Sequence, residues 1–379
     1  MILPEFQIFV KPVGALCNLA CEYCYYPEKT GLYNASPCKL LPDELLETYI
    51  AQHISASASD VVSFSWHGGE PMLAGIEFYQ KAVNFQRKYC TTGKKILNGL
   101  QTNGTLVNDE WCRFLAGEKF TVGISMDGPE PYHNAFRLTK NAGPTFSKVL
   151  AGYDMLVMNG IDPEILCVVN SANVEHPQEV YSFFRDLGAT YITFIPLVER
   201  SNNSRKPVSE RSVKAEDFGH FLCTVFDEWV KNDIGKIKVQ IIEEAFRTAF
   251  DQDHSLCIFK ETCGMVPAVE HTGDFYSCDH FVHPEWLIGN ISKQTIAQML
   301  KSEKQQTFGH NKQSLLPAYC DECEVKVMCN GECPKNRFIT TPQGEKGLNY
   351  LCAGYRKFFN HCRPMIESIR IAWQHKTNR

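Results

Sequence analysis

Short segments rich in β-branched and aromatic residues recur through the first half of this chain and predict buried β-strands. The predicted strands are residues 6–11, 61–66, 96–101, 121–125, 165–169 and 191–195. Stretches with apolar residues gathered on one side lie between or after them and predict amphipathic helices. The predicted helices are residues 43–54, 77–89, 109–115, 146–158, 178–187 and 218–231. Strands that alternate with helices in this way are typical of a parallel α/β sheet.

This alternation ends in the second half of the chain. Residues 201–216 are polar and contain Pro207, which predicts a linker or surface excursion. After about residue 235 the strand–helix rhythm disappears and cysteines become denser. We therefore expect an α/β domain over residues 1–235 and a cysteine-rich domain over residues 236–379. The pattern alone leaves open whether the first domain is a full barrel, a partial barrel or an open sheet.

Composition narrows the class of protein. The chain has 379 residues, a net charge of −5 and no run of Lys and Arg, so no nucleic-acid partner is expected. Its first residues lack a basic segment followed by a long apolar one, and no 18-residue apolar run occurs. We expect a cytoplasmic protein with no membrane partner. Its 17 cysteines then indicate metal binding or redox chemistry, and hence sensitivity to oxygen.

Three of these cysteines are closely spaced near the start of the chain, at Cys17, Cys21 and Cys24. Three thiolates on one short loop can hold three irons of a [4Fe–4S] cluster, whereas a fully protein-ligated cluster takes four cysteines. The missing ligand leaves one iron open to a small molecule. A zinc site is the alternative, although zinc usually takes four protein ligands.

The spacing C-x3-C-x2-C, followed by Tyr25 and Tyr26, resembles the signature of the radical S-adenosylmethionine (SAM) enzymes. The segment Gly68-Gly69-Glu70-Pro71 resembles a second motif of that superfamily, in which backbone beside the glycines receives the amino group of SAM. The resemblance implies that SAM chelates the open iron and is cleaved by an electron from the cluster. It also implies a partial (β/α)6 barrel.

The later cysteines resemble the SPASM domain, which carries two auxiliary [4Fe–4S] clusters. By this resemblance the first auxiliary cluster is held by Cys257, Cys263, Cys278 and Cys333, and the second by Cys320, Cys323, Cys329 and Cys352. Cys320-x2-Cys323 taken alone also suits zinc. The cysteines left over are expected to be small buried apolar residues. They are Cys38, Cys90, Cys112, Cys167, Cys223 and Cys362.

A narrower resemblance runs from about residue 7 to residue 360, to the anaerobic sulfatase-maturating enzymes. The segments that carry it are Lys11-Pro12 before Cys17, Gln101-Thr102-Asn103-Gly104-Thr105, Ser125-Met126-Asp127-Gly128-Pro129, Cys278-Asp279-His280-Phe281 and Cys329-Asn330-Gly331-Glu332-Cys333. These enzymes oxidise a Cys or Ser in a sulfatase precursor to Cα-formylglycine. The resemblance implies three [4Fe–4S] clusters, SAM as co-substrate, and an electron donor such as a flavodoxin or ferredoxin.

The same resemblance assigns site residues. Asp279 is implied to be the base that takes a proton from the substrate thiol or hydroxyl, and an ionised carboxylate is competent for this. The implied SAM contacts are Tyr26, Gly68, Gly69, Glu70, Ser125 and Arg137, with Leu197 or Val198 against the adenine. His67 stands where some relatives have Gln, and its role stays open. His133 and His280 are expected to be structural.

Two other functions are weighed. A SPASM peptide maturase would form thioether bonds or epimers in a ribosomal peptide, and many such enzymes add a peptide-recognition domain before the first cysteines. Here those cysteines begin at residue 17, which favours sulfatase maturation. A non-catalytic metal-binding scaffold would hold zinc without iron and would not cleave SAM.

Overall fold

The computed structural model of the chain describes residues 5–26, 29, 31–33, 39–90, 93–201 and 206–377. It divides into two compact units, and each is assembled from separate stretches of sequence. The first unit comprises Met1–Ser125, Phe136–Glu164 and Gly264–Gly309. The second unit comprises Met126–Ala135, Ile165–Cys263 and His310–Arg379.

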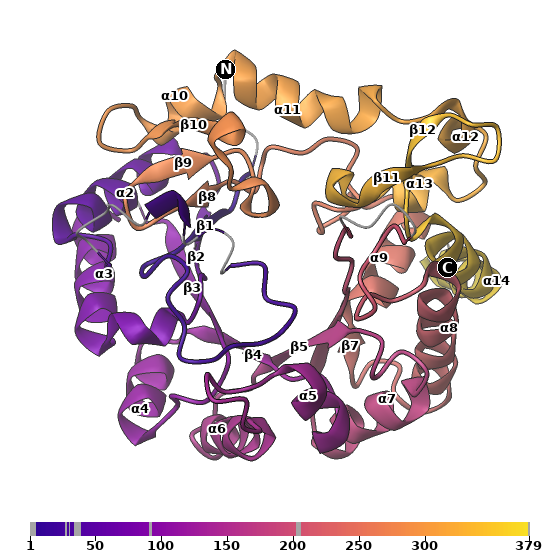
Figure 1. Cartoon of the computed structure of the whole chain (residues 1–379), viewed down its shortest axis with the longest axis horizontal. Coiled ribbons are helices and arrows are strands. Elements are labelled where there is room, and N and C mark those ends of the chain that lie inside the picture. Colours follow the sequence, from indigo (N-terminus) through magenta and orange to yellow (C-terminus); the bar gives the residue numbers. More distant parts are fainter. Residues whose placement is uncertain are drawn as a thin grey trace. The chain divides into compact units, whose positions relative to one another are not determined.

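The sheet of the first unit has the strand order β10-β9-β8-β1-β2-β3-β4 (Figure 1). Its strands are β1 (Ile8–Val10), β2 (Val61–Trp66), β3 (Lys95–Thr102), β4 (Thr121–Ser125), β8 (Ala268–Val269), β9 (Asp274–Tyr276) and β10 (Leu287–Asn290). Strands β8, β1, β2, β3 and β4 pair in parallel, and β9 and β10 add an antiparallel edge. Val10 pairs with Trp66, and Trp66 pairs with Leu100. The carboxyl ends of β1, β2 and β3 therefore lie along one edge of the sheet.

Helices accompany these strands, and all of them except the polar α11 bury apolar residues along one side. They are α2 (Asp43–Ala56), α3 (Ile76–Tyr89), α4 (Asp109–Gly117), α6 (Phe146–Met158), α10 (Ile296–Leu300) and α11 (Glu303–Ser314), whose last residues belong to the second unit. Short 3-10 turns are η1 (Gly31–Tyr33), η2 (Pro71–Ala74), η3 (Asp279–Phe281) and η4 (Pro284–Trp286). Buried aromatic rings fill the core, and Trp66 contacts Tyr79 edge to face at 5.6 Å. Helix α4 begins where Asn108 accepts a hydrogen bond from the N–H of Trp111 at 3.0 Å.

The second unit contains parallel strands in the order β5-β6-β7 and a β11–β12 hairpin. The strands are β5 (Glu164–Val169), β6 (Tyr191–Pro196), β7 (Lys238–Val239), β11 (Arg337–Thr340) and β12 (Lys346–Asn349). Its helices are α5 (Glu130–Phe136), α7 (Pro177–Asp186), α8 (Ala215–Asn232), α9 (Gln240–Ala249), α12 (Ala318–Asp321), α13 (Lys326–Cys329) and α14 (Cys352–Thr377), with a 3-10 turn η5 (Pro334–Asn336). Helix α14 packs along α8, where Phe218 contacts Tyr355 at 5.7 Å (Figure 1).

The strands and helices predicted from the sequence are all present. Four predicted bounds differ visibly from the observed ones. The first strand covers only Ile8–Val10, α2 continues to Ala56, α4 continues to Gly117, and α8 begins at Ala215. Of the expected linker, residues 202–205 lie outside the described part. Among the described helices, none is long and apolar enough to cross a membrane.

Candidate functional site

The loop after β1 brings the N-terminal cysteines together. The thiols of Cys17, Cys21 and Cys24 are each half-buried. Backbone N–H groups inside the loop donate to the carbonyls of Phe136 and Leu138 at 2.9 Å, which fixes its path. Burial raises the pKa of Cys17, and the neighbouring Cys21 adds to this shift. Burial likewise raises the pKa of Cys24, and Cys17 contributes. The three thiols therefore lie within electrostatic reach of one another.

Polar groups that follow β3 support this loop. The side-chain amide of Asn103 donates to the Sγ atom of Cys17 at 3.7 Å and to Oδ1 of Asn18 at 2.9 Å. Asn18 in turn donates to the hydroxyl of Thr105 at 2.8 Å. The N–H of Leu19 lies 3.4 Å from the Sγ atom of Cys17. Donors aimed at sulfur stabilise its thiolate form, which is the form that binds iron.

The structure explains why glycine is required at the two positions after β2, which the sequence alone did not reveal. The N–H of Glu70 donates to the carbonyl of Leu16 at 2.8 Å. A Cβ atom at Gly69 would lie 2.1 Å from that carbonyl oxygen, so no side chain fits there. Gly68 has a φ of 125°, which L-residues rarely adopt. The close approach at Gly69 is thus made by the cysteine loop itself.

Glu70 is fully buried and bonded to its own chain. Its carboxylate accepts hydrogen bonds from the N–H of Met72 at 3.0 Å, the hydroxyl of Thr102 at 2.8 Å and the N–H of Asn103 at 2.8 Å. Burial raises the pKa of Glu70 to about 7, although these hydrogen bonds oppose the shift. The contacts join the ends of β2 and β3, and the predicted contact of Glu70 to SAM stays a prediction.

Asp279 begins η3 and lies among cationic and phenolic groups. Its carboxylate forms an ion pair with the Nζ atom of Lys11, accepts a hydrogen bond from the hydroxyl of Tyr25 at 2.6 Å, and lies 3.4 Å from the hydroxyl of Tyr26. The Nζ atom of Lys29 donates to the backbone carbonyl of Asp279 at 2.7 Å. Burial alone would raise the pKa of Asp279, but Lys11 and Lys29 outweigh it and hold this pKa well below its usual value. The carboxylate is therefore ionised.

Lys11 is fully buried at the end of β1, and its Nζ atom also lies 3.3 Å from a carboxylate oxygen of Glu270. Burial would lower the pKa of Lys11, yet Asp279 and Glu270 raise it above its usual value. Burial lowers the pKa of Lys29 to about 8, and Asp279 opposes this. Sequence reasoning gave no role to these two lysines or to Glu270. The available signal was the position of Lys11, a charged residue directly after an apolar strand.

Two further predicted SAM contacts lie in the first unit. The hydroxyl of Ser125, at the end of β4, accepts a hydrogen bond from Gln101 at 3.2 Å. The guanidinium of Arg137 lies 5.5 Å from the ring centre of Tyr23 and acts electrostatically on Cys24. These contacts place both residues near the strand ends and the cysteine loop.

Leu197 and Val198 are buried and follow β6 in the second unit, so their grouping with the SAM site stays a prediction. The ring of His67 stacks on Phe9 with centres 4.1 Å apart, and burial lowers the pKa of His67 to about 4. The imidazole is therefore neutral at ordinary pH. His133 accepts a hydrogen bond on Nδ1 from the N–H of Asp127 at 3.4 Å, a structural contact as expected.

In the second unit, the cysteines assigned to the second auxiliary cluster share one neighbourhood. Burial raises the pKa of Cys352 to about 11, with contributions from Cys320 and Cys323. Burial raises the pKa of Cys329 to about 12, and Cys352 and Cys320 again contribute. Four neighbouring thiols form the donor set that a [4Fe–4S] cluster takes.

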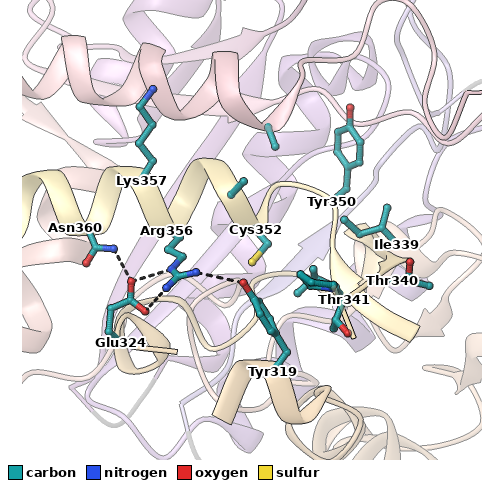
Figure 2. Close-up of a pocket in the computed structure, with 14 residues that line it drawn as sticks. Tyr319, Glu324, Ile339, Thr340, Thr341, Tyr350, Cys352, Arg356, Lys357 and Asn360 are labelled. Atoms are coloured by element: carbon teal, nitrogen blue, oxygen red, sulfur yellow. Dashed lines mark hydrogen bonds and ion pairs between the residues drawn. The ribbon is translucent and has the colours of Figure 1, made fainter. Parts of the chain in front are cut away.

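A pocket of about 780 Å³ opens beside Cys352 (Figure 2). On one side the guanidinium of Arg356 donates to both carboxylate oxygens of Glu324, at 2.8 and 2.9 Å, and to the hydroxyl of Tyr319 at 3.2 Å. Asn360 donates to the same carboxylate at 2.8 Å. The positive charge of Arg356 is therefore matched by a carboxylate.

Three of the cysteines assigned to the first auxiliary cluster also lie in the second unit. Cys257, Cys263 and Cys333 each act electrostatically on Lys312. Cys278 lies in the first unit, and its grouping with the other three stays a prediction. Within the described ranges, no three His, Cys, Asp or Glu side chains are arranged to hold a single metal ion. A [4Fe–4S] cluster has a different requirement, because its four irons take separate thiolates.

The remaining cysteines are mostly buried, as small apolar residues are. Cys112, Cys167, Cys223 and Cys362 are buried and Cys90 is half-buried. Cys38, which was expected to belong with them, lies outside the described residues.

Comparison with known proteins gives the class to which the chain belongs. Residues 12–184 match the radical SAM superfamily, and residues 257–324 match SPASM, an iron-sulfur cluster-binding domain. The chain is thus a radical SAM oxidoreductase with a cysteine-rich iron–sulfur domain, which confirms the predicted fold class.

Two relatives and one solved structure narrow the class. The serine-type anaerobic sulfatase-maturating enzyme of Bacteroides thetaiotaomicron is 43% identical over 376 residues, covering 96% of this chain and 91% of the relative. The cysteine-type enzyme of Clostridium perfringens is 31% identical over 373 residues, covering 97% and 99%. Native anSMEcpe with bound AdoMet and the Kp18Cys peptide superposes with a TM-score of 0.87 at 30% identity, covering 97% of this chain and 100% of that one. The chain belongs to the family of anaerobic sulfatase-maturating enzymes.

Proposed function

We propose that this enzyme oxidises a Cys or Ser side chain of a sulfatase precursor to Cα-formylglycine, with SAM as co-substrate. The observation that carries the proposal is Asp279, a buried, ionised carboxylate that contacts the two tyrosines following the N-terminal cysteine loop. The relatives named as serine-type and cysteine-type sulfatase-maturating enzymes support the substrate class. So does the peptide bound to anSMEcpe.

The cysteines would hold three [4Fe–4S] clusters, one at the N-terminal loop and two at the SPASM sites. The N-terminal set is Cys17, Cys21 and Cys24, the first auxiliary set is Cys257, Cys263, Cys278 and Cys333, and the second is Cys320, Cys323, Cys329 and Cys352. When bound, the N-terminal cluster and SAM supply the radical that removes a Cβ hydrogen from the target residue. The residues proposed to contact SAM are Tyr26, Gly68, Gly69, Glu70, Ser125 and Arg137, with Leu197 or Val198 near the adenine.

Asp279 would accept the proton of the substrate hydroxyl or thiol. Its lowered pKa makes it a weak base, which fits the order of events. Loss of the Cβ hydrogen makes the adjacent hydroxyl or thiol far more acidic, so a weak base that is always ionised is sufficient. A carboxylate has about four lone-pair sites, and the contacts from Lys11, Tyr25 and Tyr26 leave capacity for a further hydrogen bond.

The oxidation balances as one hydrogen atom, one proton and one electron. The radical that SAM supplies when bound would take the hydrogen atom, Asp279 would accept the proton, and an auxiliary cluster held by its cysteines would serve as the electron acceptor. From Ser these losses give the aldehyde directly. From Cys they give a thioaldehyde, which water converts to the aldehyde with release of hydrogen sulfide. An electron carrier such as a flavodoxin or ferredoxin would reduce the N-terminal cluster.

We also propose domain boundaries at residues 1–235 and 236–379. The radical SAM match at residues 12–184 falls inside the first range, and the iron–sulfur match at residues 257–324 falls inside the second. The sulfatase precursor would be the macromolecular partner.

Anaerobic incubation with SAM, a reductant and matched peptides tests the reaction. The peptides carry Ser or Cys at one position of a sulfatase-type sequence, with Ala there as the control. We expect an aldehyde that reacts with a hydrazine reagent and is detected by mass spectrometry. A thioether or epimer, which does not react with hydrazine, would instead support a peptide maturase. Bound zinc without iron, and no SAM cleavage, would support a scaffold.

The variant Asp279→Asn tests the base. It keeps the size of the side chain but cannot take the proton, so aldehyde yield should fall roughly 10²-fold or more. SAM cleavage and deuterium transfer from substrate Cβ to deoxyadenosine should persist. Aldehyde formation at the wild-type rate would make Asp279 structural.

A further inference from the structure

A half-buried arginine in the second unit binds the turn between two proposed cluster ligands. Arg337, the first residue of β11, donates from Nε to the carbonyl of Gly331 at 2.9 Å. Its Nη2 atom donates to the carbonyls of Asn330 at 2.9 Å and Glu332 at 3.0 Å, and Nη1 donates to the carbonyl of Lys312. One side chain thus collects every carbonyl between Cys329 and Cys333.

The backbone of this turn explains why the guanidinium fits. Asn330, Gly331 and Glu332 have successive φ values of 46°, 69° and 50°. A left-handed run is unfavourable for L-residues, so it persists only where surrounding contacts fix it. A Cβ atom at Gly331 would lie 2.8 Å from Nη2 of Arg337, which leaves glycine as the residue compatible with this contact. Arg337 therefore positions the turn.

Lys312, on α11, binds the backbone of a second loop, which carries the proposed ligand Cys257. The lysine is almost completely buried. Its Nζ atom donates to the carbonyls of Cys257 and Ile258, each at 2.8 Å, and to that of Lys260. An ammonium group has three N–H donors, and here all of them bind backbone carbonyls. The positive charge is hydrogen-bonded but is not paired with a carboxylate in these contacts.

The two cations act on different sets of thiols. Burial lowers the pKa of Lys312, and Cys263, Cys257 and Cys333 oppose the shift. Burial also lowers the pKa of Arg337, which Cys263, Cys320 and Cys333 oppose. The thiols that act most strongly on Lys312 belong to the first auxiliary set, and Lys312 also binds the carbonyl of Cys257. The thiols that act on Arg337 belong to both sets, and Arg337 binds the turn between Cys329 and Cys333.

One buried carboxylate shares this region. Glu332 accepts hydrogen bonds from the side-chain amides of Asn336 and Asn349. Burial raises its pKa, with Lys312 among the groups that oppose the shift. Two cations therefore stand against one carboxylate, and the surplus charge is positive.

We propose that Arg337 and Lys312 are positioning residues that raise the reduction potentials of the auxiliary clusters, Arg337 for both clusters and Lys312 for the first. The proposal rests on the auxiliary clusters of the proposed function. A cluster with four thiolates is anionic, and it becomes more anionic when it accepts an electron. A nearby cation in a medium of low dielectric stabilises the reduced form more than the oxidised form. In the balanced reaction, an oxidised auxiliary cluster accepts the one electron that leaves the substrate.

A redox titration of the full-length chain, followed by electron paramagnetic resonance, tests this without SAM or peptide. The parent carries Cys17→Ala, Cys21→Ala and Cys24→Ala, so that only auxiliary clusters report. In Arg337→Gln, we expect the equilibrium constant for one-electron reduction to fall at least tenfold for both clusters, or about 59 mV. In Lys312→Gln, we expect a similar fall for the first cluster alone.

Two further variants separate charge from shape. Arg337→Lys keeps the charge but loses the forked hydrogen bonds. The equilibrium constants for reduction of both clusters should therefore stay within threefold of those of the parent. The clusters should nevertheless be lost faster when a chelator is added. Lys231→Gln removes one charge from an exposed site on α8 and should shift neither potential.

Three outcomes would overturn the inference. Arg337→Gln with about eight irons and unchanged potentials would make the arginine purely structural. Arg337→Lys shifted as far as Arg337→Gln would show that charge is not the cause. A parent protein without iron would refute the auxiliary clusters themselves. If Arg337→Gln fails to retain iron, Lys312→Gln and Arg337→Lys still decide the matter. Failure of aldehyde formation is read in a separate assay, so the two proposals fail distinguishably.

Discussion

Lys11 in the first unit and Lys312 in the second are both fully buried lysines, but they bind different partners. The Nζ atom of Lys11 lies between the carboxylates of Asp279 and Glu270. The Nζ atom of Lys312 binds three backbone carbonyls. Burial acts to lower both pKa values, yet carboxylates raise that of Lys11 above its usual value, whereas that of Lys312 stays lowered.

The difference shows how one side chain serves two kinds of chemistry. Beside Asp279 the charge of Lys11 is balanced by carboxylates, and its effect is to keep the proposed proton acceptor ionised. Beside Cys257 and Cys263, the described hydrogen bonds of Lys312 go to backbone carbonyls, although the buried carboxylate of Glu332 acts on its charge. A buried charge without a directly bonded counter-ion is costly, so the proposed anionic cluster would stabilise this arrangement.

The largest test of the comparison removes the thiols of one region and leaves the other intact. Changing Cys17, Cys21 and Cys24 to Ala should abolish SAM cleavage and remove about four of about twelve irons. The auxiliary clusters should keep their spectra, because their proposed ligands lie elsewhere in the sequence. Iron analysis and a SAM-cleavage assay check this. Full iron content together with SAM cleavage would show that the N-terminal assignment is wrong.

A second test removes the cation that binds the carboxylates of Asp279 and Glu270. Lys11→Met leaves two carboxylates buried without their cation, and stability should fall by about 3–5 kcal/mol. The double variant Lys11→Met with Asp279→Asn removes one uncompensated charge and should recover part of that loss. Anaerobic denaturant titrations of the two single variants, the double variant and the wild type complete the cycle. Additive losses would mean that Lys11 and Asp279 do not interact.

The fold was largely predictable because its signals are local. The alternation of apolar strands and amphipathic helices predicted β1 to β6 and most of the helices between them, whereas the short helix α5 was not predicted. The later elements carried weaker signals, since β7 and β8 have two residues each, and α14 contains Pro364, which a sequence pattern takes as a break. These elements depend on tertiary packing, such as that of α14 against α8.

The grouping of the cysteines was visible in the sequence, and their roles as ligands stay a prediction. The electrostatics of the site was not predictable. Cysteine spacing marks cluster sites because sulfur is required at fixed intervals. The partners of Asp279 are separated from it by 250 or more residues along the chain, as for Lys29 and Tyr25. No local pattern encodes such contacts. Arg337 was equally hidden, because its partners are backbone carbonyls, which every residue has.

A smaller effect is expected on the pH dependence of stability. It comes from Glu70, a buried carboxylate of the first unit that forms no ion pair within the described part of the chain. Its pKa is about 7 in the folded state and about 4.3 when unfolded. Between these values the folded state holds a proton that the unfolded state lacks, so stability rises as pH falls from about 7 to about 4.3. The slope is at most about 1.4 kcal/mol per pH unit.

Glu70→Gln removes this titration and isolates it from other groups. The variant loses one of three hydrogen bonds, at a cost of about 1–3 kcal/mol. Its stability deficit against the wild type should be larger near about pH 5 than near about pH 8. Anaerobic denaturation midpoints at both pH values check this. A deficit independent of pH would mean that Glu70 has an ordinary pKa.

The smallest effect is expected from a variant of a buried cysteine that is not a proposed ligand. Cys112 on α4 is completely buried, and burial raises its pKa, which keeps it a neutral thiol. The proposed ligands are instead mostly half-buried and grouped. Cys112→Ala should therefore leave iron content, SAM cleavage and cluster potentials unchanged. Stability should fall by only about 0.8 kcal/mol, the scale of one deleted buried methylene group. Loss of iron in this variant would contradict the division of the cysteines into ligands and core residues. A fully buried, isolated thiol would then be a ligand, and burial and grouping would not distinguish the two kinds.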